Sequence, residues 1–172
     1  QLQGIGVVFF NSPSMIRDLK PELIHLMFQL ASITSPNIYE INFMLASLLS
    51  SLEDYDKSIE VYKEIPTNHY LGEYASIQIS NLYSLEDNNK EAIEQLERFL
   101  KTNKTFDGFL SLGNYYRYDL EWKEAADAYQ KAIDLGSDID NQNLWEAYFK
   151  VGIVHERSDN WNEAENNFLK AL

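Results

Sequence analysis

Histidines and carboxylates are the residue types in this sequence that could carry catalytic or metal chemistry. The three histidines, His25, His69 and His155, have no partner at metal-ligand spacing, and the sequence HERSD at His155 lacks the H-E-x-x-H pattern. The carboxylates lie on faces predicted to meet solvent, whereas a general-acid pair needs a cleft that raises one pKa. The chain has no Cys, which excludes disulfides and thiolate metal sites. The sequence therefore predicts no catalytic residue, no metal and no cofactor.

The balance of charge limits the classes of partner. The chain has 27 Asp and Glu against 14 Lys and Arg, a net charge of −13. Phosphate backbones and anionic lipid surfaces both attract Lys and Arg, so the composition argues against nucleic-acid and membrane-surface binding. The acidity either serves solubility or selects a basic partner by electrostatic steering. The longest apolar run near the start, Ile5–Phe10, is far too short to insert across a membrane.

Four segments of the chain echo one another and reveal internal repeats. Each is a turn followed by an amphipathic stretch, and they are Ser51–Glu60, Ser84–Glu94, Leu120–Tyr129 and Asp159–Phe168. A small residue follows each turn, and one further equivalent position lies upstream. The separations are 34, 34, 33 and 39 residues along the series Ile24, Ser58, Ala92, Ala125 and Ala164. This period predicts helical hairpins, with one insertion before the last.

These repeats resemble the tetratricopeptide repeat. The family's signature is W-x2-L-G-x2-Y, followed after a turn by Ala, by an aromatic residue four positions on and by a second Ala. The fourth repeat matches every residue class at the family's spacing, with Phe109, Leu112, Gly113, Tyr116, Ala125, Tyr129 and Ala132. The last repeat departs from the signature only at His155. Two others keep the spacing with weaker identities, and the first has six extra residues in its turn. The phrasing of Tyr55–Pro66 and Trp161–Leu172 is similar to bacterial members, which tilts the expected localisation toward the periplasm or cell envelope over the cytoplasm.

The resemblance implies an all-α fold, a right-handed α-solenoid of about five antiparallel helix-turn-helix repeats. The repeats of this single domain, 1–172, are predicted at about 1–36, 39–69, 73–105, 106–143 and 145–172. Helices packed about 8–10 Å apart need small residues where they cross. Gly113 and Gly152 are such residues, so leucine at either is expected to cost about 1–3 kcal/mol. The polar stretch 136–143 is predicted to be a loop, and the chain, which begins without Met and stops inside an apolar helical pattern, is expected to be a piece of a longer array.

The first helix of each pair lines the concave groove in the superhelix that the resemblance implies. Its exposed stripe lies beside the packing positions, and the residues predicted to bind a partner are Phe43, Tyr74, Ile77, Asn81, Leu110, Asn114, Arg117, Phe149 and Lys150. Many peptide-binding members hold the ligand backbone with an Asn at the place of Asn81 and Asn114. The apolar floor would come from Phe43, Ile77, Leu110 and Phe149. The alternative is that these faces only contact a neighbouring repeat or solvent.

The predicted function is a scaffold or adaptor, without enzymatic activity, that binds a segment of another protein in this groove. Members that grip acidic C-terminal tails use a clamp of Lys, Arg and Asn, whereas this chain has Phe43, Ser47, Asp107 and Glu146 at those places. A basic or apolar segment is therefore expected rather than an acidic one. Two alternatives stay open. One is a structural module within a longer array that self-associates through its uncapped C-terminal end, and the other is an accessory domain of a larger enzyme.

Overall fold

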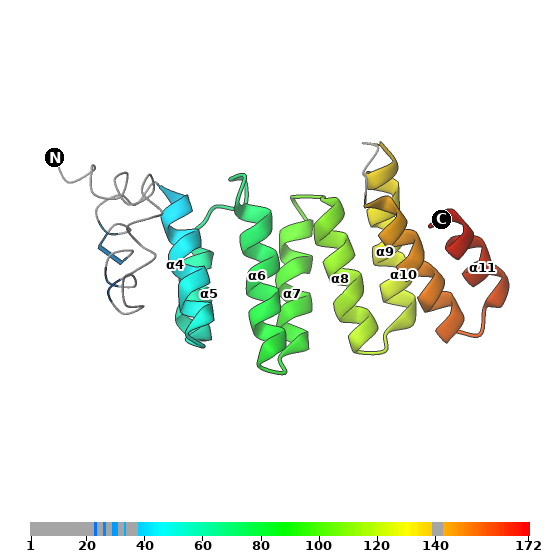
Figure 1. Cartoon of the computed structure of the whole chain (residues 1–172), viewed down its shortest axis with the longest axis horizontal. Coiled ribbons are helices and arrows are strands. Elements are labelled where there is room, and N and C mark those ends of the chain that lie inside the picture. Colours follow the sequence, from blue (N-terminus) through cyan, green and yellow to red (C-terminus); the bar gives the residue numbers. More distant parts are fainter. Residues whose placement is uncertain (1–22, 24–25, 27–28, 31–32, 34–37, 139–142) are drawn as a thin grey trace. The chain divides into compact units, whose positions relative to one another are not determined.

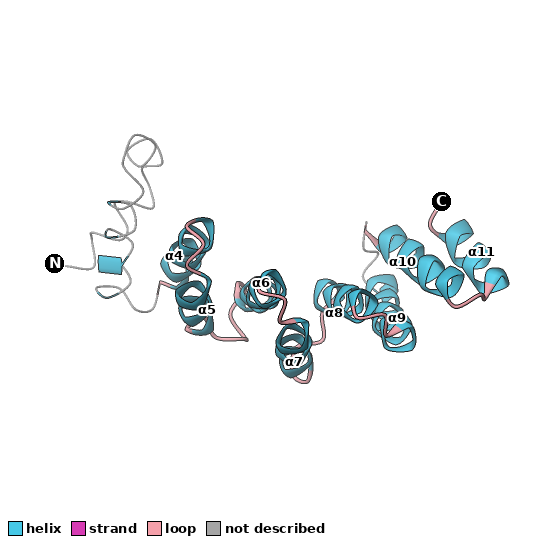
Figure 2. Cartoon of the chain, turned by 90° about the horizontal axis from the view of Figure 1, so that it is seen from below, coloured by secondary structure: helices cyan, strands magenta, loops and turns pink. Residues whose placement is uncertain are grey.

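The computed structural model describes residues 38–138 and 143–172, together with the single residues 23, 26, 29, 30 and 33. Over the two continuous stretches the chain forms helices and no strand (Figures 1 and 2). In order they are α4 (Tyr39–Ser51), α5 (Tyr55–Lys63), α6 (Gly72–Leu85), α7 (Asn89–Leu100), α8 (Phe106–Tyr118), α9 (Trp122–Asp138), α10 (Leu144–Arg157) and α11 (Trp161–Lys170). The all-α fold class is thereby confirmed. The repeat predicted over residues 1–36 lies outside the described residues apart from those five single positions.

The chain divides into two compact units, Gln1–Leu82 and Tyr83–Leu172. In the first unit, α4 packs against α5. In the second, α7, α8, α9 and α10 each pack against the next helix along the chain, which for α10 is α11. Consecutive helices within each unit run in opposite directions (Figure 1), as expected for stacked helical hairpins. The organisation as one domain with the repeat bounds given above stays a prediction.

The turns inside the four described hairpins share one backbone geometry. Each has a residue with positive φ, between 57° and 62°, namely Glu53, Asp87, Leu120 and Asp159. The N–H of the following residue donates to the carbonyl five positions earlier, at 3.0 Å for Asp54 to Leu49 and 2.9 Å for Glu121 to Tyr116. This is the Schellman arrangement, which satisfies carbonyls at the end of a helix. The next helix begins one residue later, so the turns are as short as the echoing sequences predict.

Small residues lie where the two helices of a hairpin cross, as the sequence predicts. Ala46 and Ser58 are fully buried in the first unit, and the Ser58 hydroxyl donates to the Ala46 carbonyl across the hairpin at 2.7 Å. In the second unit a Cβ on Gly113 would lie 2.4 Å from Cε1 of Tyr129, and one on Gly152 would lie 2.5 Å from Cδ1 of Phe168. Such distances are far inside ordinary contact, so both positions accept only glycine unless the facing ring moves.

The prediction of a loop over 136–143 is wrong at its start. Helix α9 continues through Gly136 and Ser137 to Asp138. Gly136 is buried, and a Cβ there would lie 2.9 Å from both Leu144 and Phe106. Polar composition suggested a loop, but the packing of α9 against the starts of α8 and α10 holds this extra turn in helical form. Residues 139–142 lie outside the described part of the chain.

Candidate functional site

The predicted groove residues fall into both compact units. Phe43, Tyr74, Ile77 and Asn81 belong to the first unit, on α4 and α6. Leu110, Asn114, Arg117, Phe149 and Lys150 belong to the second, on α8 and α10. The structure therefore describes two separate faces, each of which carries part of the predicted stripe.

A polar network on the second unit is centred on Asn114. The Asn114 Oδ1 accepts a hydrogen bond from the Tyr129 hydroxyl at 2.9 Å and a second from Lys150 Nζ at 2.9 Å. Lys150 also forms an ion pair with Glu146, one turn earlier on α10, at 3.2 Å. We call these four residues the Asn114 network. It joins the first helices of two successive repeats, because α8 supplies Asn114 and α10 supplies Lys150 and Glu146.

The network fixes the direction in which the Asn114 amide points. An ammonium group has only donors, so the amide oxygen must face Lys150. The Nδ2 group then points away from both of its neighbours, and among the described residues it has no hydrogen-bond partner. Asn114 is only half-buried. The site thus offers an amide donor whose orientation is set before any ligand arrives.

Arg117 lies one turn beyond Asn114 on α8 and adds a second donor. Its Nε is buried and has no hydrogen-bond partner among the described residues. Its guanidinium carbon lies 4.9 Å from the centre of the Tyr118 ring. Burial raises the pKa of Tyr129 to about 12, and the nearby Arg117 guanidinium opposes part of that rise. Tyr129 therefore stays a neutral hydroxyl donor to Asn114 at physiological pH.

The apolar residues of the predicted stripe on the second unit differ in their exposure to solvent. Phe149 is 46% exposed, and its ring packs on Phe168 with centroids 5.6 Å apart. Leu110 is only 8% exposed, so its side chain offers a partner little apolar surface. A position beside the packing stripe was expected to be open, but α8 buries a wider part of its surface than a single stripe.

The first unit contains a hydrogen bond equivalent to the one between Tyr129 and Asn114, formed by other residues. Ser47 and Tyr62 occupy the places of Asn114 and Tyr129, and their hydroxyl oxygens lie 2.8 Å apart. The Phe43 ring packs edge-on against Tyr62, with centroids 5.2 Å apart. Tyr74 is exposed on α6 and Ile77 is half-buried. Asn81 is exposed, and the aromatic position of its repeat is taken by Leu96, which has no hydroxyl.

An aromatic cluster at the start of α4 was not predicted. The His69 ring lies 5.0 Å from that of Tyr39 and 4.5 Å from that of Tyr70. The Tyr70 hydroxyl donates to Glu40, and this bond lowers the pKa of the Glu40 carboxyl. These residues are brought together by the connection between α5 and α6, whose path the repeat spacing does not specify.

The part of the chain that the structure describes shows neither a metal-binding cluster nor a membrane-spanning helix. No cluster of three or more His, Asp or Glu side chains there could hold a metal ion. Within the same residues, none of the helices is both long and apolar enough to span a bilayer.

Helical hairpins of one period, crossing at small residues and closed by one type of turn, define a helical-repeat protein of the α-solenoid class. Residues 39–65 match the tetratricopeptide repeat family model. No curated protein sequence matches this chain. The family match places a tetratricopeptide repeat at residues 39–65. The solved structures described next show the same fold over most of the chain.

Several solved structures share the fold at low sequence identity. MamA from Desulfovibrio magneticus RS-1 (41-end) is 20% identical, with 99% of this chain and 95% of that chain covered and a TM-score of 0.71. YrrB, described as a TPR protein with an unusual peptide-binding site, is 12% identical, with 96% and 82% covered and a TM-score of 0.66. BtubC from P. vanneervenii is 14% identical, with 96% and 75% covered and a TM-score of 0.69. At these identities the likeness concerns the fold.

Proposed function

We propose that this protein is an interaction scaffold and that the face formed by α8 and α10 binds an extended segment of a partner protein. The observation that carries the proposal is the Asn114 network. Lys150 and Tyr129 use the amide oxygen, which leaves the Nδ2 donor directed outward. A backbone carbonyl of an extended segment is the acceptor that such a donor suits, because every peptide residue presents one.

The surroundings of Asn114 indicate the chemistry of the segment. Phe149 offers an exposed ring on which an apolar side chain can pack. The charge of Lys150 is already engaged by Glu146, and the chain as a whole carries −13. A strongly acidic segment would be repelled, so a basic or apolar segment fits better. That YrrB is described as having a peptide-binding site supports a similar use of this fold here.

The sharpest test changes one atom of the network. Asn114→Asp keeps an oxygen facing Tyr129 and Lys150 but replaces the outward N–H donors with a second oxygen. We expect this variant to lose the partners that the wild-type chain retains when it is used as bait in extracts of the source cell. Each bound protein should fall at least about tenfold, as expected when a buried hydrogen bond is replaced by acceptor–acceptor contact.

The matched control is Asn166→Asp, the same chemical change at an exposed position of α11. It should retain all partners, and both variants should keep the wild-type circular dichroism spectrum. If Asn114→Asp captures the same proteins in the same amounts as the wild type, the α8–α10 face is not the binding site.

A further inference from the structure

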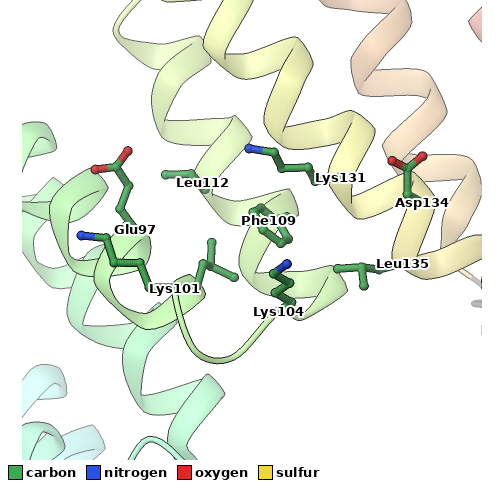
Figure 3. A pocket seen from close by; sticks show the side chains of 9 residues that line it. Glu97, Lys101, Lys104, Phe109, Leu112, Lys131, Asp134 and Leu135 are labelled. Carbon is green, nitrogen blue, oxygen red and sulfur yellow. The ribbon is translucent and has the colours of Figure 1, made fainter.

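A second surface of the Tyr83–Leu172 unit is hollowed on the other side of α8. A pocket of about 530 Å³ lies between α7, α8 and α9 (Figure 3). Its apolar floor comes from Leu100, Phe109 and Leu112, which are nearly fully buried. Phe109 and Leu112 lie on a different stripe of α8 from Asn114, so this pocket does not belong to the Asn114 network.

The rim of the pocket is unusually basic for such an acidic chain. Lys101, Lys104 and Lys131 surround the floor, with Glu97 and Asp134 as the acidic residues (Figure 3). Lys131 Nζ lies 5.6 Å from the centre of the Phe109 ring. None of the three lysines forms an ion pair with a described residue, whereas Glu97 accepts a hydrogen bond from Tyr116 at 2.7 Å. An occupant that suits this pocket combines a large apolar side chain with flanking carboxylates.

The turn between α8 and α9 has this chemistry. Its residues Tyr118 and Leu120 are 61% and 66% exposed, and Asp119 and Glu121 lie beside them. Leu120 also has a φ of 62°, a conformation that is unfavourable for a leucine. The other three turns place an acidic residue at the same position. A largely exposed leucine in a strained conformation contributes little to the packing of its own hairpin, which points to a role in binding.

The turn cannot reach the pocket of its own chain. Phe109 and Leu135 mark the end of the α8–α9 hairpin at which α8 begins and α9 ends, and the turn is at the opposite end (Figure 1). The 13 residues of α8 separate the two by about 20 Å. The turn can therefore enter this pocket only in another molecule.

We propose that the Tyr118–Glu121 turn of one copy of this protein docks into the lysine-rimmed pocket of a second copy, with Leu120 on the apolar floor and Glu121 beside the lysines. The contact joins two different surfaces, so it repeats from copy to copy and builds head-to-tail assemblies. Because both copies carry −13, we expect a weak contact, with a Kd of about 10 µM to 1 mM.

Sedimentation equilibrium of the purified chain and of two variants tests this contact. Leu120→Gly removes the apolar anchor, and Lys101→Glu/Lys131→Glu reverses the charge of the rim. Each variant alone should associate at least about tenfold more weakly than the wild type. Lys170→Glu, at an exposed lysine of α11 outside both the pocket and the turn, should associate like the wild type.

Two further results separate docking from misfolding. Glycine relieves the positive φ at position 120, so Leu120→Gly should keep or raise the thermal midpoint while it weakens association. An equimolar mixture of the two variants retains one intact pocket and one intact turn, so it should form dimers and nothing larger. The proposal is overturned if the wild type stays monomeric at about 1 mM, if Leu120→Gly associates normally, or if the mixture stays monomeric. If the wild type stays monomeric but binds a synthetic peptide of residues 117–123, the pocket accepts a segment of this chemistry. Its partner is then a different protein and not a second copy.

Discussion

Substitution of Gly113 by alanine is the most direct test of how the hairpins are packed. The new methyl group would lie 2.4 Å from Cε1 and 2.5 Å from Cδ1 of Tyr129. Ordinary contacts of this kind lie at 3.4–4 Å, so the Tyr129 ring or the whole of α9 must move. The ring is fully buried and its hydroxyl is held by Asn114, the residue next to Gly113. The side chain that has to move is therefore restrained at both ends.

The expected cost combines three contributions. Overpacking of a well-filled interior costs about 1–3 kcal/mol, and loss of the hydrogen bond from Tyr129 to Asn114 would add about 1 kcal/mol. Alanine is the better helix former by about 1 kcal/mol. The net loss of unfolding free energy is therefore about 1–3 kcal/mol for Gly113→Ala, which corresponds to a fall in thermal midpoint of several degrees.

Gly152→Ala is the matched comparison. Its methyl group would meet Phe168 at 2.5 Å, an equally short distance. Phe168 is only half-buried, has no hydroxyl and lies in α11, the last described helix, so it can turn aside. The gain in helix propensity then offsets most of the strain, and we expect a change within about 1 kcal/mol.

Tryptophan fluorescence during urea unfolding is a suitable assay. All three tryptophans, Trp122, Trp145 and Trp161, lie in the Tyr83–Leu172 unit that contains both glycines. In a Tyr129→Phe background the ring is no longer held by Asn114, so the cost of Gly113→Ala should fall by at least about 0.5 kcal/mol. Equal destabilisation by the two glycine substitutions, or a neutral Gly113→Ala, would refute the reasoning.

Three further predictions concern stability. Thr105→Ala removes the hydroxyl that accepts from the Gly108 N–H at the start of α8, and urea unfolding should show a loss of about 1 kcal/mol; no loss would contradict this role of the hydroxyl. Ser58→Ala places the residue of three other repeats at a fully buried site, so calorimetry should show a change within about 1 kcal/mol despite the lost bond to Ala46; a larger loss would contradict the equivalence of the repeats. Burial raises the pKa values of Tyr115 and Tyr129 to about 12 from 10.0. The folded state holds these protons more tightly, so stability is complete below pH 10 and falls between about pH 10 and 12. Absorbance at alkaline pH should show their ionisation together with unfolding, and ionisation near pH 10 in a folded chain would contradict it.

The repeat spacing was sufficient to predict which small residues lie at the crossings of the described helices. The small residues Ala46, Ser58, Ala92 and Ala125 are all fully buried, because each repeat must present the same minimal side chain where two backbones approach. The type of turn could not be predicted. A helix that ends in the Schellman arrangement is usually recognised by glycine, and none of the four positive-φ residues here is glycine.

The candidate site was predicted as a set of positions but not as a network. Asn114 and Lys150 are 36 residues apart, and only the packing of α8, α9 and α10 brings their side chains to 2.9 Å. From the sequence, Tyr129 was identified only as the aromatic residue of the repeat signature, although its hydroxyl group is itself a sequence signal. A tyrosine rather than a phenylalanine at a buried position indicates a polar partner nearby. In two repeats both of these positions have polar side chains. The pairs are Ser47 with Tyr62 and Asn114 with Tyr129, and the members of each pair are hydrogen-bonded to each other.

The positive-φ turns imply that this chain could be stabilised at residues that belong to neither proposed contact surface. Glycine at Glu53, Asp87 or Asp159 would relieve a conformational cost without changing the Asn114 network or the lysine-rimmed pocket. Each exchange would also remove one negative charge from a chain that carries −13. These turns are therefore natural places to tune solubility and thermal tolerance by protein engineering. At Leu120 alone the same exchange would also alter the assembly proposed above.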